Sequence, residues 1–138
     1  MPKKDLYHDK VKNALIKDGW EITHDPLRLS WGSKDMYVDL GAEQVLAAER
    51  QGQKIAVEIK SFIGLSEMDD TEKALGQYLL YRSVMSRTEP DRLLYLSVHE
   101  EIYTDIFDEP LGQILIEDYQ LRLMIFDLNE EVVLKWIP

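Results

Sequence analysis

The spacing of apolar residues along the chain predicts two helices of different length. Residues 5–18 carry apolar side chains at intervals of three and four, which places them on one face of a helix that Gly19 closes. A longer helix with similar spacing is predicted to begin at Ser66 or Asp70 and to continue to about Arg87. This second helix is long enough to cover one face of a sheet.

Short runs of β-branched, aromatic and other apolar residues predict strands between and after these helices. The run at 92–98 is apolar almost throughout, which is typical of a strand buried on both faces. A turn at residues 50–53 favours a hairpin. The predicted strands span residues 36–41, 44–48, 54–62, 92–98, 121–127 and 132–137, with two short helices at 100–108 and 111–119 that are split at Pro110. One mixed α/β domain over residues 1–138 follows, because no repeat, linker or low-complexity tract divides the chain.

The strand predicted at residues 54–62 carries two charged side chains on one face. Alternation directs its Ile and Val residues to one face and directs Glu58 and Lys60 to the other. An earlier predicted strand carries a single carboxylate, Asp39, shortly before a glycine that ends or bends it. If the two strands pair, the carboxylates of Asp39 and Glu58 can approach each other.

Asp39 and Glu58 would form a carboxylate pair suited to a divalent metal ion. Two carboxylates in a partly buried site either share a proton or bind a cation. Their hard oxygen atoms suit Mg²⁺ or Mn²⁺, which one or two protein carboxylates commonly hold. Such a metal ion acidifies a water molecule, and the Lys60 ammonium group adds positive charge on the same face. The pattern indicates phosphodiester hydrolysis, although alternating charges on a solvated strand face explain it equally well.

The order of Asp39, Glu58 and Lys60 resembles the D…(D/E)xK signature of the PD-(D/E)XK nuclease superfamily. Val38 stands where the proline in the name of the superfamily is expected. Five longer segments are also informative: HDKVKNALIKDGWEITHDPL at 8–27, DLGAE at 39–43, AVEIKSF at 56–62, KALGQYLLYRS at 73–83 and EPDRLLYLSV at 89–98. Together they resemble the XisH family of element-excision controlling factors over nearly the whole chain.

The resemblance implies a restriction-endonuclease-like fold with an αβββαβ core, followed by further C-terminal helices and strands. It also implies a role in programmed DNA excision in cyanobacteria, together with a site-specific recombinase and a XisI-type partner. In a site of this kind, Asp39 and Glu58 hold Mg²⁺ or Mn²⁺, and Lys60 positions or activates the attacking water. Nuclease activity does not follow from the resemblance alone.

Four further residues are candidates for roles near this site. Gln77 and Tyr81 lie on one side of the long helix and resemble the QxxxY element of some nucleases of the superfamily, with Gln77 orienting substrate or water. A glutamine at the helix boundary beside a core tyrosine explains them equally well. Glu43 either reaches the same site or is exposed. His8 on the first helix either reaches the edge of the site or belongs to a polar helix face.

The charge of the chain is distributed unevenly. The net charge is −10, and residues 1–60 contain ten basic and ten acidic residues, whereas residues 61–138 contain six and sixteen. DNA contacts rely on Lys and Arg, so any contact with DNA is expected from the first part. The acidic second part is expected to face solvent or a protein partner, with the acids between Glu100 and Asp118 as the interface. A rival interpretation follows, in which the chain is a non-catalytic regulatory or assembly subunit.

The composition of the chain limits its expected location in the cell and the kinds of metal site that it can form. No segment approaches the roughly 20 apolar residues of a membrane span, and the N-terminus has no apolar secretion signal, so we expect a cytoplasmic protein without membrane contact. The chain has no cysteine, which excludes thiolate metal sites. Because isologous pairing is common among soluble proteins, a homodimer is a general expectation that no feature of this sequence strengthens.

The histidines away from the first helix and the three tryptophans are expected to be structural. His24 and His99 have no partner at metal-ligand spacing. Trp20, Trp31 and Trp136 are expected to anchor the core or its rim, because no basic residues are interleaved with them in the sequence.

Overall fold

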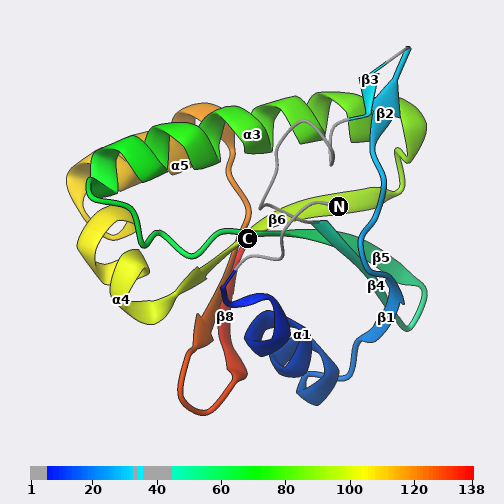
Figure 1. The fold of residues 1–138 in the computed structure, drawn as a ribbon, viewed down its shortest axis with the longest axis horizontal. Helices are drawn as coiled ribbons and strands as arrows, with labels where there is room; N and C mark the ends of the chain where they lie inside the picture. Colours follow the sequence, from blue (N-terminus) through cyan, green and yellow to red (C-terminus); the bar gives the residue numbers. More distant parts are fainter. Residues whose placement is uncertain (1–5, 33, 36–44) are drawn as a thin grey trace.

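A computed structural model describes residues 6–32, 34–35 and 45–138 of the chain. Within these ranges a six-stranded mixed sheet runs through the molecule (Figure 1). Its strands, in spatial order, are β1 (Glu21–His24), β4 (Val45–Arg50), β5 (Gln53–Ile59), β6 (Arg92–His99), β7 (Leu123–Asp127) and β8 (Val132–Ile137). β5, β6 and β7 are parallel, and the remaining pairs are antiparallel. Two short strands, β2 (Ser30–Trp31) and β3 (Lys34–Asp35), form a separate ribbon.

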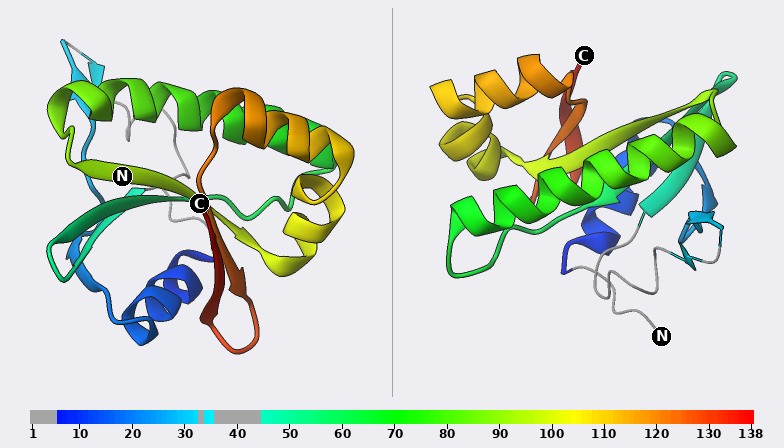
Figure 2. Two further views of the ribbon diagram at one scale, coloured as in Figure 1. Left: turned by 180° about the vertical axis from the view of Figure 1, so that it is seen from behind. Right: turned by 90° about the horizontal axis from the view of Figure 1, so that it is seen from above.

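Helices cover both faces of this sheet. α1 (His8–Lys17) lies on one face, whereas α3 (Glu67–Thr88) and α5 (Pro110–Tyr119) lie on the other (Figures 1 and 2). Between β6 and α5 the chain forms the short helix α4 (Glu100–Ile102) and a π-helix, η1 (Tyr103–Phe107). Two apolar cores result, one beneath α1 and one beneath α3. Among the described residues, no helix combines the length and apolar character that a bilayer crossing requires.

The side chains of β5 alternate as the sequence predicts. Ile55, Val57 and Ile59 pack in the core beneath α1, whereas Ala56 packs in the core beneath α3. Because successive side chains of a strand point to opposite faces, Glu58 shares the face of Ala56 and lies beneath α3.

β4 and β5 form the hairpin predicted at residues 50–53. Arg50 pairs with Gln53, and the two residues between them have positive φ angles, 50° at Gln51 and 82° at Gly52. Two successive positive φ angles are typical of a type I′ turn, whose twist matches that of the flanking strands.

A crossover through α3 connects the parallel strands β5 and β6. Two polar contacts hold the loop that leads into α3 against the first turn of the helix. The Ser66 side chain accepts a hydrogen bond from the Asp69 N–H at 3.1 Å and caps α3, as the sequence predicts. The buried Asp70 carboxylate accepts a hydrogen bond from the Gly64 N–H at 2.7 Å. A Cβ on Gly64 would lie only 2.5 Å from an Asp70 carboxylate oxygen. The loop after Lys60 is therefore tied closely to the first turn of α3.

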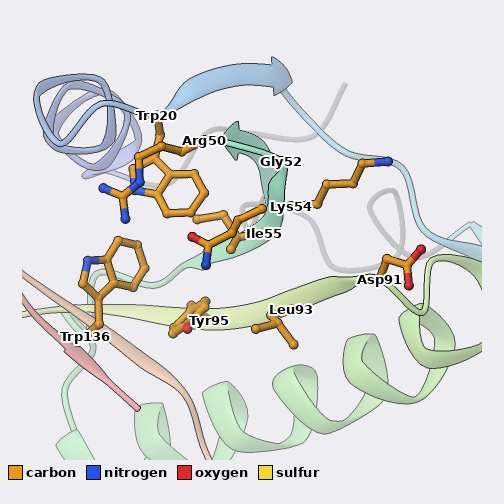
Figure 3. A pocket seen from close by; sticks show the side chains of 10 residues that line it. Trp20, Arg50, Gly52, Lys54, Ile55, Asp91, Leu93, Tyr95 and Trp136 are labelled. Carbon is orange, nitrogen blue, oxygen red and sulfur yellow. The ribbon is translucent and has the colours of Figure 1, made fainter.

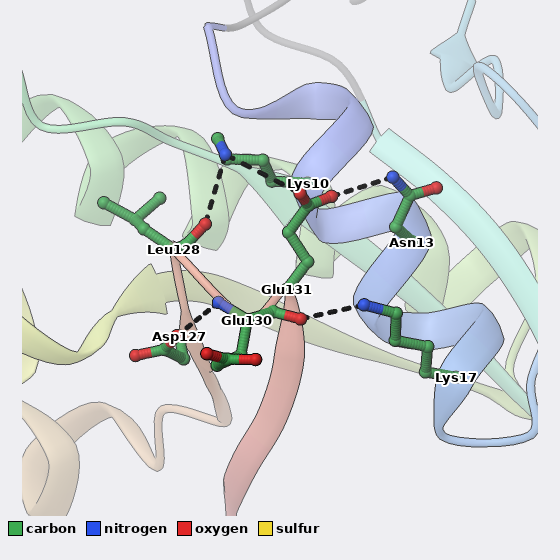
Figure 4. A network of polar contacts seen from close by, with 7 residues as sticks. All are labelled: Lys10, Asn13, Lys17, Asp127, Leu128, Glu130 and Glu131. Atoms are coloured by element: carbon green, nitrogen blue, oxygen red, sulfur yellow. Dashed lines mark hydrogen bonds and ion pairs between the residues drawn. The ribbon is translucent and has the colours of Figure 1, made fainter.

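The turn between β7 and β8 holds α1 in place through polar contacts (Figure 4). Lys10 and Lys17 donate hydrogen bonds to backbone carbonyl groups of this turn at 3.1 and 2.8 Å. Asn13 donates a hydrogen bond to the Glu131 carboxylate at 2.8 Å. The polar face of α1 is thus engaged within the protein and joins the two ends of the described chain.

The structure confirms the mixed α/β fold and most of the predicted elements. Both long helices, the buried strand, the break before Pro110 and the closing strand pair are present. The π-helical turn at Tyr103–Phe107 was not predicted, because its sequence reads as an ordinary short helix. The strand predicted at 36–41 lies outside the described residues.

Candidate functional site

Glu58 is an acidic residue in the interior of the sheet. It lies on β5 between β4 and β6, its side chain is 0 % exposed, and both of its carboxylate oxygens are buried. Its backbone carbonyl accepts a hydrogen bond from the Ser97 hydroxyl on β6 at 3.0 Å. Burying an ionised carboxylate is costly, and an apolar residue would serve packing better. The carboxylate is therefore a candidate for a functional role.

Lys60 lies two residues beyond Glu58, immediately after β5 ends. Its side chain is half-buried. The alternation of β5, continued by one residue, predicts that this side chain lies on the same face as Glu58. A carboxylate and an ammonium group thus occupy the carboxyl end of a central strand that is parallel to β6. This is the end of the strands at which open α/β sheets commonly bind their ligands.

Gln77 lies on the part of α3 that covers the same face of the sheet. Arg82 donates a hydrogen bond to the Tyr119 carbonyl at 2.6 Å, so this flank of α3 faces α5. Gln77 is five residues earlier, about 140° around the helix, and therefore lies on the flank turned away from α5. Its side-chain oxygen is buried and accepts no hydrogen bond from a described residue. Tyr81, one turn further on, also has a buried hydroxyl group.

Asp39 and Glu43 lie outside the described residues, so their approach to Glu58 stays a prediction. Within the described ranges, no three His, Asp or Glu side chains are grouped as a metal site requires. Of the two predicted metal ligands, Glu58 is the one whose position the structure describes.

His8, a candidate for a supporting role, is buried beside Asp25. His8 Nε2 lies 2.9 Å from one carboxylate oxygen of Asp25, and the Lys12 ammonium lies 3.0 Å from the other. Burial raises the pKa of Asp25, but the hydrogen bonds and charges of His8 and Lys12 outweigh this effect, so the pKa is lowered. Since α1 covers the face of the sheet opposite to α3, His8 and Glu58 belong to different faces. A role for His8 at the edge of the site stays a prediction.

His99 ends β6 and is buried between aromatic rings. Its ring centroid lies 5.7 Å from that of Tyr7 and 6.5 Å from that of Phe126, in edge-to-face arrangements. Burial lowers the pKa of His99 below the usual 6.5, although the charges of Glu101 and Asp105 act in the opposite direction. The ring contacts give His99 a packing role, which agrees with the sequence-based interpretation.

Acidification is expected to destabilise the protein through His99. Unfolded His99 binds a proton near pH 6.5 and folded His99 only at lower pH, so the unfolded state binds more protons between these values. The stability associated with the neutral ring is complete above about pH 6.5 and is lost progressively as the pH falls below it. Urea unfolding at about pH 7.5 and about pH 5.5 measures this loss. His99→Phe keeps a ring but removes the titration, so its stability should change less; an equal change in both proteins would contradict the assignment.

The opposite end of β5 contributes to a pocket of about 220 Å³ lined by tryptophan and arginine (Figure 3). Trp20 and Trp136 have ring centroids 5.8 Å apart, and the Arg50 guanidinium lies 4.3 Å from the Trp20 ring centroid. Arg50 also donates a hydrogen bond to the Asp18 carbonyl at 2.7 Å. Although no basic residue is interleaved with the tryptophans in the sequence, β1–β4 pairing brings Arg50 onto Trp20. Trp31, expected at the core or its rim, is 54 % exposed and therefore lies outside the core.

Comparison with known proteins identifies the family of the chain. A family model described as XisH protein matches residues 1–134. The chain belongs to the XisH family. The match confirms the resemblance found in the sequence, and membership of the PD-(D/E)XK superfamily stays a prediction.

Two solved structures are similar to this XisH chain over nearly their full length. The first is a fdxN element excision controlling factor protein from Anabaena variabilis, which is 41 % identical, with 96 % of this chain and 98 % of that chain covered and a TM-score of 0.87. The second is a XisH family protein from Nostoc punctiforme, which is 40 % identical, with 97 % and 100 % covered and a TM-score of 0.88. No curated protein gives a significant match. The fold of this XisH chain is thus the fold of both structures.

Proposed function

We propose that this XisH chain controls the excision of a DNA element and carries a nuclease-like metal site. The first part is supported by the relative from Anabaena variabilis, which is named a fdxN element excision controlling factor. The second part rests on Glu58, a fully buried carboxylate that is followed two residues later by Lys60. This buried acid is the observation that carries the proposal, because packing alone favours an apolar residue at that position.

Asp39 and Glu58 are the residues that would hold Mg²⁺ or Mn²⁺. Their oxygen donors fit these hard cations, and a cation would offset the negative charge of a carboxylate that is buried beneath α3. When bound, the metal ion would lower the pKa of a water molecule and offset charge on a phosphate oxygen.

The other side chains of the proposed site act on the water and the phosphate. The Lys60 ammonium donates a hydrogen bond to the attacking water or to a phosphate oxygen and adds fixed positive charge. Gln77 accepts a hydrogen bond from the water through its side-chain oxygen, which is buried and has no donor among the described residues. Tyr81, Glu43 and His8 are candidates for supporting roles, beside the alternatives of a core tyrosine, an exposed carboxylate and a polar helix face.

The proposal places the chain in the PD-(D/E)XK superfamily, with a restriction-endonuclease-like core. The order of the elements around the six-stranded sheet supports this, because α1, β1, β4, β5, α3 and β6 come in the order of an αβββαβ core, with the separate β2–β3 ribbon between β1 and β4. β7 and β8, with the helices before them, are then the C-terminal additions.

A second candidate function is a non-catalytic subunit that keeps the fold and assembles other proteins. Lys10, Lys12 and Lys17, which are all the Lys and Arg residues of α1, each contact their own chain, so α1 offers no unengaged lysine or arginine to DNA. In both proposals the partners are a XisI-type protein and a site-specific recombinase, and the location is the cytoplasm. DNA is the substrate only in the first.

Metal-dependent DNA cleavage tests the catalytic proposal. The wild type should cleave supercoiled, nicked or branched DNA with Mg²⁺ or Mn²⁺, and Lys60→Ala and Asp39→Ala should each lose on the order of a hundredfold in rate. Lys54→Ala is a matched control, because Lys54 is an exposed lysine at the other end of β5 and should be dispensable for cleavage. Inactivity of the wild type, or equal activity of all four proteins, would leave only the assembly function.

Metal binding gives a readout that does not depend on turnover. Calorimetric titration with Mn²⁺ should show binding to the wild type and its loss in Glu58→Gln, which keeps the shape of the side chain and removes its charge. If the wild type binds neither Mn²⁺ nor Mg²⁺, the metal site is wrong whatever the outcome of the cleavage assay.

A further inference from the structure

α5 is an apolar helix that the described part of the protein leaves largely uncovered. Gly112 is its buried residue, and Leu115 and Ile116 are partly buried against the core beneath α3. Leu111 and Ile114 are 44 % and 52 % exposed. Leu111 and Ile114 are exposed neighbours on the helix surface, and with the partly buried Leu115 at their edge they follow the i, i+3, i+4 spacing of one stripe. Single exposed apolar residues are common, but neighbouring exposed residues on one helix face favour a surface that binds another molecule.

Acidic residues accompany this apolar stripe. Residues 100–120 contain seven Asp and Glu and no Lys, Arg or His. All seven side chains are exposed, and none forms an ion pair with a residue of the described ranges. These residues are Glu100, Glu101, Asp105, Asp108, Glu109, Glu117 and Asp118. Arg82 and Lys135 contact Tyr119 and Tyr103 of this segment, but neither forms an ion pair with its seven acids, so a positively charged partner would be attracted to the segment.

α5 presents the stripe from a fixed position. Near its start, the Gln113 side-chain amide donates a hydrogen bond to the Phe107 carbonyl at 2.9 Å. At its end, Arg82 of α3 donates a hydrogen bond to the Tyr119 carbonyl, and Gln120 closes the helix in the left-handed conformation with a φ of 51°. A helix face held in this way loses little conformational freedom when a partner binds, which favours affinity.

We infer that the exposed side of α5 docks a protein partner with an apolar patch flanked by Lys and Arg. DNA does not fit this surface, because the acidic segment repels phosphate groups. A second copy of the chain in a two-fold arrangement would bring the same acids face to face, which also opposes binding. The inference rests on the proposed function, in which the partner is a XisI-type protein. The exposed side of α5 is the surface of this chain that the partner would contact.

Binding of a XisI-type protein to purified variants tests this surface. Leu111→Gln with Ile114→Gln should weaken binding by about tenfold or more, because both apolar side chains would leave the centre of the interface. Glu117→Gln with Asp118→Asn should weaken binding less and should reduce its dependence on salt. Ile16→Gln is the matched control, since Ile16 is an equally exposed apolar residue on α1, on the opposite face of the sheet. Calorimetry measures affinity, and thermal unfolding verifies that each variant is folded.

Each contrary outcome overturns a defined part of the inference. Wild-type affinity in both double variants would overturn the α5 surface and leave the partnership of the proposed function standing. No binding to the wild-type chain would overturn the partnership and the surface together. Self-association that Leu111→Gln with Ile114→Gln abolishes, seen by sedimentation, would show that a second copy covers α5 and would overturn the basic partner.

Discussion

Gly112→Ala is expected to lower the free energy of unfolding by about 3 kcal/mol, at the upper end of the cost of overpacking. A Cβ at this position would overlap the carbonyl oxygen of Ile106 and the Cα atom of Phe107. Both atoms belong to the backbone of η1, which cannot yield as the end of a flexible side chain can. The higher helix propensity of alanine raises the free energy of unfolding by only about 1 kcal/mol, which is less than the steric clash lowers it.

Urea unfolding followed by circular dichroism measures this loss, and a second glycine provides the control. A Cβ on Gly76, in the middle of α3, would meet no atom within 4 Å. Gly76→Ala is therefore expected to stabilise the protein by about 0.5 to 1 kcal/mol, because it gains helix propensity without a clash. A Gly112→Ala protein as stable as the wild type would contradict the close approach of α5 to η1.

Trp20→Ala is expected to cost about 3 to 5 kcal/mol of stability, the usual range for removing a buried tryptophan. The Trp20 side chain is buried, packs against Trp136 and lies beneath the Arg50 guanidinium. Its indole N–H donates a hydrogen bond to the Asp18 carboxylate at 3.2 Å. Because Trp20 follows α1 and contacts side chains of β4 and β8, its loss loosens several elements at once.

Trp31→Ala is the matched control for this large effect. Trp31 is mostly exposed, so its removal should change the free energy of unfolding by no more than about 0.5 kcal/mol. Urea unfolding of both variants, followed by circular dichroism, makes the comparison. Similar losses in the two proteins would show that the Trp20 cluster contributes little beyond general surface packing.

Local signals were sufficient to predict most of the elements of the fold. Gly19 follows the first helix with a φ of 92°, as a helix-closing glycine does. Ser66 caps α3 as expected, and Gly52 supplies the second positive φ angle of the predicted hairpin. In each case the determining interaction lies within a few residues of the chain, so one sequence is enough to reveal it.

Interactions between distant residues could not be predicted in the same way. The cation–π contact of Arg50 with Trp20 depends on the pairing of β1 with β4, which no local pattern encodes. The close approach of Gly112 to η1 depends on the path of the intervening turn. A glycine inside a predicted helix indicates that another part of the chain packs closely there, but it does not reveal which atoms approach it.

The candidate site also combines features that local patterns predict with features that depend on distant parts of the chain. Alternation correctly placed Glu58 on the face opposite to Val57, but its complete burial depends on α3, which the crossover to β6 lays across that face. Helical spacing placed Gln77 and Tyr81 on one side of α3, and the structure adds that the Gln77 side-chain oxygen and the Tyr81 hydroxyl group are buried. The approach of Asp39 to Glu58 is the part of the predicted site that still awaits a test.

The attachment of α1 to the β7–β8 turn has a consequence for synthesis on the ribosome. The apolar side of α1 packs against residues of β8, and Lys10 and Lys17 bind the turn that precedes it. The nascent helix therefore emerges long before β8 and the β7–β8 turn do, and the part of its apolar side that packs against β8 stays exposed until translation is almost complete. We expect ribosome-bound chains that stop before residue 128 to leave this helix accessible to proteases and chaperones.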